Sequence, residues 1–231
     1  ALHGAPEGDT TAQAALGRRV IAGTFTGSAE YLGPGQARMV SPGLALDAAI
    51  TEHPAALAVL RGALDVAVTP VAAQRWARLV VDLPQGLAAL VDQPLTAFAG
   101  ERQVAALSLQ LLTEATRTLA SAGIVPADLP GMDMGRLRKL HTVAGFFAQG
   151  ALKRESLVFP GERALPISLW QRLRRRSSTE VDALYGPLVR HAQEANVPTP
   201  VLARLKEALH HVAATGTFLT VDGMKRALSR G

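Results

Sequence analysis

Apolar residues recur at helical spacing through most of the chain. From Val71 onward they return every three or four residues, which is the spacing of one face of an amphipathic helix. This pattern predicts helices over residues 71–82, 86–92, 98–123, 134–150, 168–173, 179–195, 199–213 and 221–229. Residues 71–231 are therefore expected to form one helical domain.

The first 70 residues have shorter and more mixed apolar runs. They predict helices over 10–16 and 44–64, strands over 18–25 and 65–70, and a hairpin over 28–40. Gly33-Pro34-Gly35 is expected to turn the hairpin, and Pro54 to kink the second helix. Residues 1–70 thus resemble a partial α/β layer, with too few strands for a complete dinucleotide-binding domain.

Composition narrows the class of protein. The chain has 231 residues, of which 48% are hydrophobic, so it can bury a sizeable core. It has no cysteine, which excludes disulfides, thiolate metal sites and a cysteine nucleophile. No apolar run reaches the ~18–20 residues of a membrane span, and the start shows no secretion signal. We therefore expect a cytoplasmic protein with no membrane partner.

Charge adds little to this picture. The net charge is +5, which favours anionic ligands only weakly. A basic run at Arg172, Arg174, Arg175 and Arg176 is either a solvated face or a surface for a carboxylate or phosphate. No aromatic residues are interleaved with it, so no nucleic-acid partner is expected. The histidines lack ligand spacing, so no metal site is expected either.

Three stretches together resemble one known family. They are the hairpin Glu30–Gly35, the segment Gln74–Leu90, and Ser168 followed by Thr179-Glu180-Val181-Asp182 and Val197-Pro198-Thr199-Pro200-Val201. The chain resembles ketopantoate reductase (2-dehydropantoate 2-reductase). That family joins an NADPH-binding Rossmann domain to a helical domain of the 6-phosphogluconate dehydrogenase C-terminal type. The resemblance implies a mainly α fold of this type, preceded by a partial α/β Rossmann remnant with a β-hairpin.

The departures from the family's pattern shape the functional expectation. The first half of the Rossmann domain, with its glycine fingerprint, has no counterpart here. Arg78 stands where the family has its catalytic lysine, and Asp82 where it has an asparagine. In the family the lysine protonates the ketone oxygen during hydride transfer, whereas an arginine does not readily release a proton. Ser168 and Glu180, which hold the substrate's polar groups in the family, are both retained.

Each candidate residue also has a purely structural interpretation. Glu180 could be a general acid or base, or a carboxylate that complements a helix start, where Thr179 and Asp182 would form a capping box. Arg78 and Asp82 could line a cleft, or form a local ion pair one helical turn apart. The predicted catalytic residues are Glu180 and Arg78, and the predicted substrate-binding residues are Ser168, Asp82, Arg172 and Trp170.

Three functions follow from this combination. The first is a non-redox enzyme, without a cofactor, that isomerises, cyclises or eliminates a small anionic or polar molecule. The second is a divergent NADPH-dependent 2-keto acid reductase, as a fragment or a subunit. The third is a non-catalytic binding or interaction protein. All three predict a homodimer, joined through the 98–123 helix or exposed strands, since open strand edges need cover.

Overall fold

A computed structural model describes residues 5–26, 28–33, 35–41, 43–129, 133–139, 168–174 and 180–229. The chain divides into two compact units, residues 1–76 and 77–231, which are described separately below. The division falls inside helix α3 (Val71–Asp82), whose bounds are those that the apolar spacing predicts. In the described chain, no helix is both long enough and apolar enough to cross a membrane.

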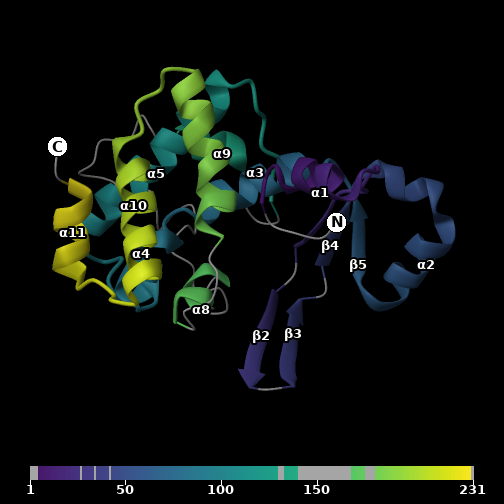
Figure 1. Cartoon of the computed structure of the whole chain (residues 1–231), viewed down its shortest axis with the longest axis horizontal. Helices are drawn as coiled ribbons and strands as arrows, with labels where there is room; N and C mark the ends of the chain where they lie inside the picture. The colour runs from purple at the N-terminus through teal and green to yellow at the C-terminus, as the bar shows by residue number, and fades with distance from the viewer. Residues whose placement is uncertain are drawn as a thin grey trace. The chain divides into compact units, whose positions relative to one another are not determined.

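The first unit is built on a three-stranded sheet (Figure 1). Its strands, in spatial order, are β1 (Gly23–Phe25), β4 (Gly43–Leu46) and β5 (Asp65–Val68). β4 runs antiparallel to β1 and parallel to β5. Leu44, Ala45 and Leu46 are almost fully buried, as expected for a central strand that is covered on both faces.

The predicted hairpin is confirmed as a separate two-stranded element. It consists of β2 (Ser28–Gly33) and β3 (Gln36–Ser41), which pair antiparallel. Gly35 in the connecting turn has a φ of 74°, a left-handed conformation that glycine adopts without steric cost. The predicted helix near the start is also confirmed as α1 (Gly8–Leu16), which ends at Gly17 with a φ of 62°.

The predicted helix over 44–64 is wrong in its first part. Its first residues form strand β4, the 3-10 helix η1 (Ala48–Glu52) follows, and α2 (Pro54–Ala63) begins only then. Pro54 is the first residue of α2 rather than a kink, because that position has no intrahelical bond to lose. Leu44, Leu46, Ile50 and Leu57 pack together, so one apolar cluster joins all three elements. The predicted strand over 18–25 is likewise shorter, since β1 has only three residues.

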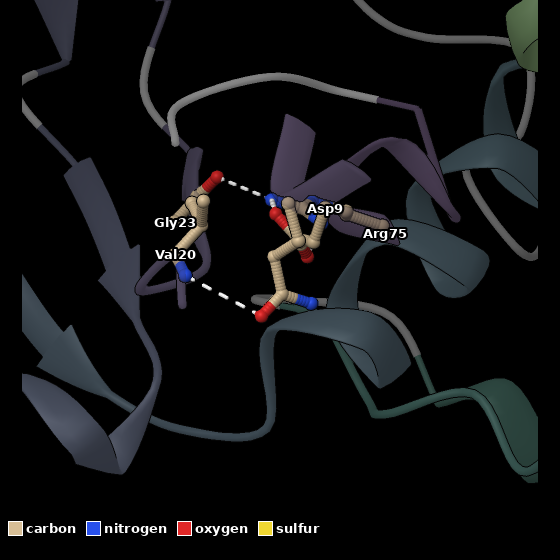
Figure 2. A network of polar contacts seen from close by, with 5 residues as sticks. Asp9, Val20, Gly23 and Arg75 are labelled. Atoms are coloured by element: carbon tan, nitrogen blue, oxygen red, sulfur yellow. Dashed lines mark hydrogen bonds and ion pairs between the residues drawn. The ribbon is translucent and has the colours of Figure 1, made fainter. Parts of the chain in front are cut away.

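A buried ion pair fixes the beginning of α3 within this unit (Figure 2). Both terminal nitrogens of Arg75 bond to the Asp9 carboxylate on α1. Arg75 Nη2 also donates to the Gly23 carbonyl oxygen on β1, at 2.6 Å. The Arg75 side chain has no exposed surface, so the Asp9 carboxylate is what makes its charge tolerable there. Three segments that are far apart in sequence are thereby tied together.

The second unit is helical. Its elements are α4 (Gln85–Val91), η2 (Leu95–Ala97), α5 (Arg102–Ser121), α6 (Met134–Lys139), α8 (Ser168–Arg174), α9 (Val181–Glu194), α10 (Pro200–Thr215) and α11 (Val221–Ser229). α5 lies at its centre and packs against α6, α9, α10 and α11. Its apolar stripe, including Leu107, Leu111 and Leu119, is buried. α5 starts at Arg102 rather than at residue 98, and most of the predicted helix over 134–150 lies outside the described residues.

A carboxylate from α5 caps the start of α10. The Glu114 oxygens accept the backbone N–H groups of Val201 and Leu202, at 3.0 and 2.8 Å. Thr199, the residue just before α10, makes no side-chain cap of its own. Glu114 therefore satisfies helix-start donors that would otherwise lack a partner in the core. Burial raises the pKa of Glu114, and the two backbone donors partly offset that rise.

Candidate functional site

Helix α8 is held against the end of α4. The buried side chains of Leu169 and Leu173 anchor it in the core. The Trp170 indole N–H donates to the Asp92 carboxylate, with a nitrogen–oxygen distance of 2.7 Å. Arg174 Nε lies 3.1 Å from the same Asp92 oxygen. Asp92 ends α4 in a left-handed conformation, with a φ of 53°, and α8 packs against α4. These contacts give α8 a fixed position although it has only two turns.

The docked helix presents Arg172 to Glu180. Arg172 Nη2 lies 2.7 Å from Glu180 Oε1, and these side chains are 43% and 38% exposed. Glu180 is the residue just before α9, yet its side chain makes no capping bond to that helix. Its carboxylate is therefore paired across to α8, in a position that solvent and a small ligand can reach.

A second charged pair lies at the end of α3. Arg78 Nε lies 2.6 Å from Asp82 Oδ2, which confirms the local ion pair expected from their spacing. The Asp82 carboxylate raises the pKa of Arg78, which outweighs the effect of burial. The Arg78 guanidinium therefore keeps its proton at any physiological pH.

Tyr185 connects this second pair to α9. Its ring is buried in the core of the second unit. Its hydroxyl lies 3.1 Å from the place that a Cβ would occupy on Gly86, in the first turn of α4. Burial raises the pKa of Tyr185, and the Asp82 carboxylate raises it further. Tyr185 of α9 therefore lies near Asp82 at the end of α3.

The structure places the remaining predicted residues in different roles. Ser168 is the first residue of α8, and its side chain lies outside what the structure describes. The Trp170 N–H is bonded to Asp92, so its role in substrate binding stays a prediction. The Asp182 carboxylate meets Lys206 Nζ at 2.8 Å and His210 Nε2 at 3.2 Å, both on α10, and its predicted capping box with Thr179 stays a prediction. Thr179 lies outside the described residues, and α9 begins at Val181.

Sequence reasoning missed the contributions of Tyr185 and Asp92. The position of Tyr185 near Asp82 and Gly86 has no local sequence signal, because these residues are on α3 and α4. Asp92 gives no local signal, since it bonds to a residue 78 positions away. No group of three or more histidine, aspartate or glutamate side chains in the described ranges could hold a metal ion.

This helical unit, with a carboxylate at the start of one helix and an arginine on the helix beside it, belongs to a known class of domain. The sequence pattern described as "Ketopantoate reductase PanE/ApbA C terminal" matches residues 71–213. The chain therefore belongs to the ketopantoate reductase PanE/ApbA family. A search of curated proteins found no match.

Solved structures agree on the fold. A PanE/ApbA family ketopantoate reductase from Ralstonia eutropha JMP134 is 21% identical, with a TM-score of 0.71, over 93% of this chain and 66% of that one. A dimeric ketopantoate reductase from Staphylococcus aureus is 17% identical, with a TM-score of 0.62, over 87% of this chain and 64% of that one. D-mandelate dehydrogenase with NADH and anilino(oxo)acetate is 14% identical, with a TM-score of 0.61, over 84% of this chain and 60% of that one.

These likenesses establish the fold, a helical domain of this family preceded by a partial α/β region. The chain spans less than two thirds of the length of each of these three proteins, namely 66%, 64% and 60%.

Proposed function

We propose that the chain is an enzyme that acts on a small 2-oxo acid by acid–base chemistry, without transferring hydride. The proposal rests on one observation, namely that Arg78 is protonated and ion-paired. The family resemblance puts Arg78 at the position of the proton-donating lysine, and its pairing with Asp82 holds its proton in place. A group that keeps its proton can orient a substrate or stabilise negative charge, but it is a poor general acid.

The substrate class follows from the relatives' names. The family is named for ketopantoate, and one relative is described with anilino(oxo)acetate, which carries an oxo group beside its carboxylate. A carboxylate of this kind suits Arg172, because a guanidinium has five N–H donors and can hold a second carboxylate beside Glu180. The binding surface would be completed by Ser168 and Trp170, which are on the same helix. Asp82 would contribute by holding Arg78 in place.

Glu180 would carry the chemical step. Its carboxylate would take a proton from the carbon next to the substrate's carbonyl group, and the C–H electron pair would move toward the carbonyl oxygen as an enolate forms. Return of that proton to a neighbouring atom gives an isomer, with no change in oxidation level. Departure of a leaving group instead gives an elimination. Cationic Arg78 would stabilise the developing negative charge.

Deuterium exchange tests this step directly. The purified chain would be incubated in D2O with 2-oxobutyrate, without nicotinamide nucleotide, and loss of the C3 proton signal would be followed by NMR. We expect the wild type to accelerate exchange. Glu180→Gln should slow it by about 10²-fold or more, as for loss of a general base. Glu194→Gln, at the far end of α9 with 59% of its side chain exposed, is the matched control and should exchange like the wild type.

Other outcomes identify the other two functions. Reduction of the 2-oxo acid that requires added NADPH would replace this proposal with the divergent reductase. The reductase and dehydrogenase names of the structural relatives favour that second candidate. Binding of 2-oxobutyrate with neither exchange nor reduction would indicate a binding protein. Exchange that is equally fast in Glu180→Gln would remove Glu180 from the mechanism.

We also propose that the chain forms a homodimer, as the Staphylococcus aureus relative does by its name. β5 is the last strand in the order of its sheet, so one of its edges has no neighbouring strand in the described part. Val68 on β5 is 38% exposed, and Val59 on α2 is 75% exposed. An unpaired strand edge with apolar side chains nearby is a surface that association would cover.

A further inference from the structure

Asp92 has a backbone conformation that favours glycine. Its φ of 53° lies in the left-handed region, and among the described residues other than glycine only Asn196 shares this region, with a φ of 52°. Gly216 shows the usual solution, a glycine with positive φ at the end of α10. Position 92, at the end of α4, therefore keeps a side chain against its backbone preference. An observed outlier of this kind indicates that the side chain has a task.

The contacts of the Asp92 carboxylate show what it holds. Asp92 Oδ1 accepts the Trp170 indole N–H at 2.7 Å, and Arg174 Nε lies 3.1 Å from the same oxygen. The Arg174 side chain is 60% exposed and its guanidinium lies 6.0 Å from the centre of the Trp170 ring, so both of its contacts are weak. Trp170 is only 8% exposed, and its buried N–H needs the partner that Asp92 provides. The Trp170 bond is therefore the stronger contact.

The residues of α8 that pack and the residue that meets Glu180 lie on different sides of the helix. Successive residues are turned by about 100°, so residues two apart are turned by about 200°. Leu169, Trp170 and Leu173 share the buried side, and α8 packs against α4. Arg172 lies on the other side, where its Nη2 is 2.7 Å from Glu180 Oε1. Docking on one side therefore determines where the arginine on the other side lies.

The two members of this pair depend on different supports. Helix α8 has only seven residues, too few to be stable without its packing. Glu180 instead precedes α9, which is anchored by buried Val181 and packs against α5 and α10. Weaker docking of α8 would therefore displace Arg172 and leave Glu180 in place.

We infer that Asp92 is a positioning residue, which sets the affinity of the site for its substrate without touching the substrate. It keeps α8 docked on α4 and thereby keeps Arg172 beside Glu180. This inference rests on the proposed function, in which Arg172 binds the substrate's carboxylate. Because that carboxylate binds the docked helix, a saturating substrate restores docking. Asp92 should therefore affect KM more than kcat.

Glycine at position 92 separates positioning from stability. Asp92→Gly removes the carboxylate but suits the left-handed backbone, so the chain should keep its fold, which a thermal melt checks. In the D2O exchange assay with 2-oxobutyrate, KM should rise by roughly threefold to tenfold, up to the factor by which one neutral hydrogen bond favours the docked helix. kcat should stay within about twofold of the wild type. A loss of folded protein would instead lower the apparent kcat and leave KM unchanged.

Two further variants make the test specific. Asn196→Gly removes an exposed side chain from the other left-handed position, just after α9, and should leave KM unchanged. Asp92→Asn keeps an oxygen acceptor for the Trp170 N–H and tolerates a positive φ, so it should retain the wild-type KM. An unchanged KM in Asp92→Gly, or an equal rise in either other variant, would overturn the role of Asp92 and leave the proposed function standing.

Arginine labelling tests the role of Asp92 without any turnover. A wild type that exchanges no deuterium would overturn the proposed function alone. Phenylglyoxal, which modifies accessible guanidinium groups, would then be used, and modification of Arg172 followed by peptide mass spectrometry. Asp92→Gly should label Arg172 faster than the wild type by roughly threefold to tenfold, whereas Arg190 on α9, 49% exposed, should label equally in both proteins. Equal labelling of Arg172 in both proteins would overturn the inference.

Discussion

Arg75 holds a full positive charge on a side chain with no exposed surface, whereas Asp9 keeps 22% of its side chain exposed. The two residues of this pair are therefore not equivalent. If Asp9 is removed, the guanidinium stays buried with only the Gly23 carbonyl as a strong acceptor. If Arg75 is removed, water can reach the remaining carboxylate. A buried charge that loses its partner is the more costly case.

Asp9→Ala should therefore lower the free energy of unfolding of the first unit by about 3–5 kcal/mol. Arg75→Met, which keeps much of the side-chain volume, should lower it by less. The free energy is measured from the urea dependence of amide hydrogen exchange in β4. Arg19→Met is the control, because Arg19 is 71% exposed and 3.9 Å from Glu52, where a surface pair contributes little. A larger effect from Arg75→Met than from Asp9→Ala would contradict this account.

Distance along the chain explains why such residues escaped prediction. The Arg75–Asp9 contact joins positions 66 residues apart, and the Glu114–Leu202 contact joins positions 88 apart. The Arg78–Asp82 ion pair is one of the two interpretations that the sequence offers, because helical periodicity alone brings these residues together. The Arg172–Glu180 pair needed the docking of α8 on Asp92, which no local pattern contains.

At the scale of elements, α10 depends on a cap that another helix provides. Glu114 accepts two backbone N–H groups at the start of α10 from a buried position on α5. Because its folded-state pKa is raised, the folded chain binds a proton there more readily than the unfolded chain does. Its contribution to stability is therefore greatest at low pH and declines as the pH rises above about 4.5 through the folded-state pKa.

Glu114→Gln tests this sign. Glutamine cannot ionise and keeps one oxygen acceptor, so it should be less stable than the wild type at pH 4, by about 1 kcal/mol. The difference should shrink as the pH rises toward 7, when the wild-type carboxyl ionises. Urea unfolding of both proteins across this pH range gives the difference between their free energies of unfolding. The other carboxylates are the same in both proteins, so their effects cancel in this difference. A difference that grows with pH would show that the two N–H donors outweigh burial.

Elements with strong periodicity were predicted well, and the short apolar strand was not. α3 and α11 have the predicted bounds, and the hairpin turns at the predicted glycines. The run Leu44-Ala45-Leu46 is too short to distinguish a buried strand from the start of a helix. It forms a strand because β1 and β5 pair with it on both edges.

For the whole molecule, the testable property is association. We expect light scattering to give the mass of a dimer. Val68→Lys places a charge on the open edge strand β5 and should shift the chain toward monomer, as charged edge residues commonly do. Val125→Lys, at a residue of the second unit that is 71% exposed, is the matched control and should leave the dimer intact. A monomeric wild type would refute the proposal. A Val68→Lys variant that stays dimeric would show that the interface does not include β5.

The contact between Gly86 and Tyr185 also limits how these two positions can change during evolution. A Cβ at Gly86 would lie 3.1 Å from the Tyr185 oxygen and 3.0 Å from Leu205 Cδ2. The leucine methyl group can rotate away, but a tyrosine ring held in the core cannot. A side chain gained at position 86 therefore requires either a shift of the Tyr185 ring by a few tenths of an ångström or a shorter residue at position 185. These two positions are 99 residues apart in sequence. Across related chains, we expect a larger residue at one of them to occur together with a smaller residue at the other.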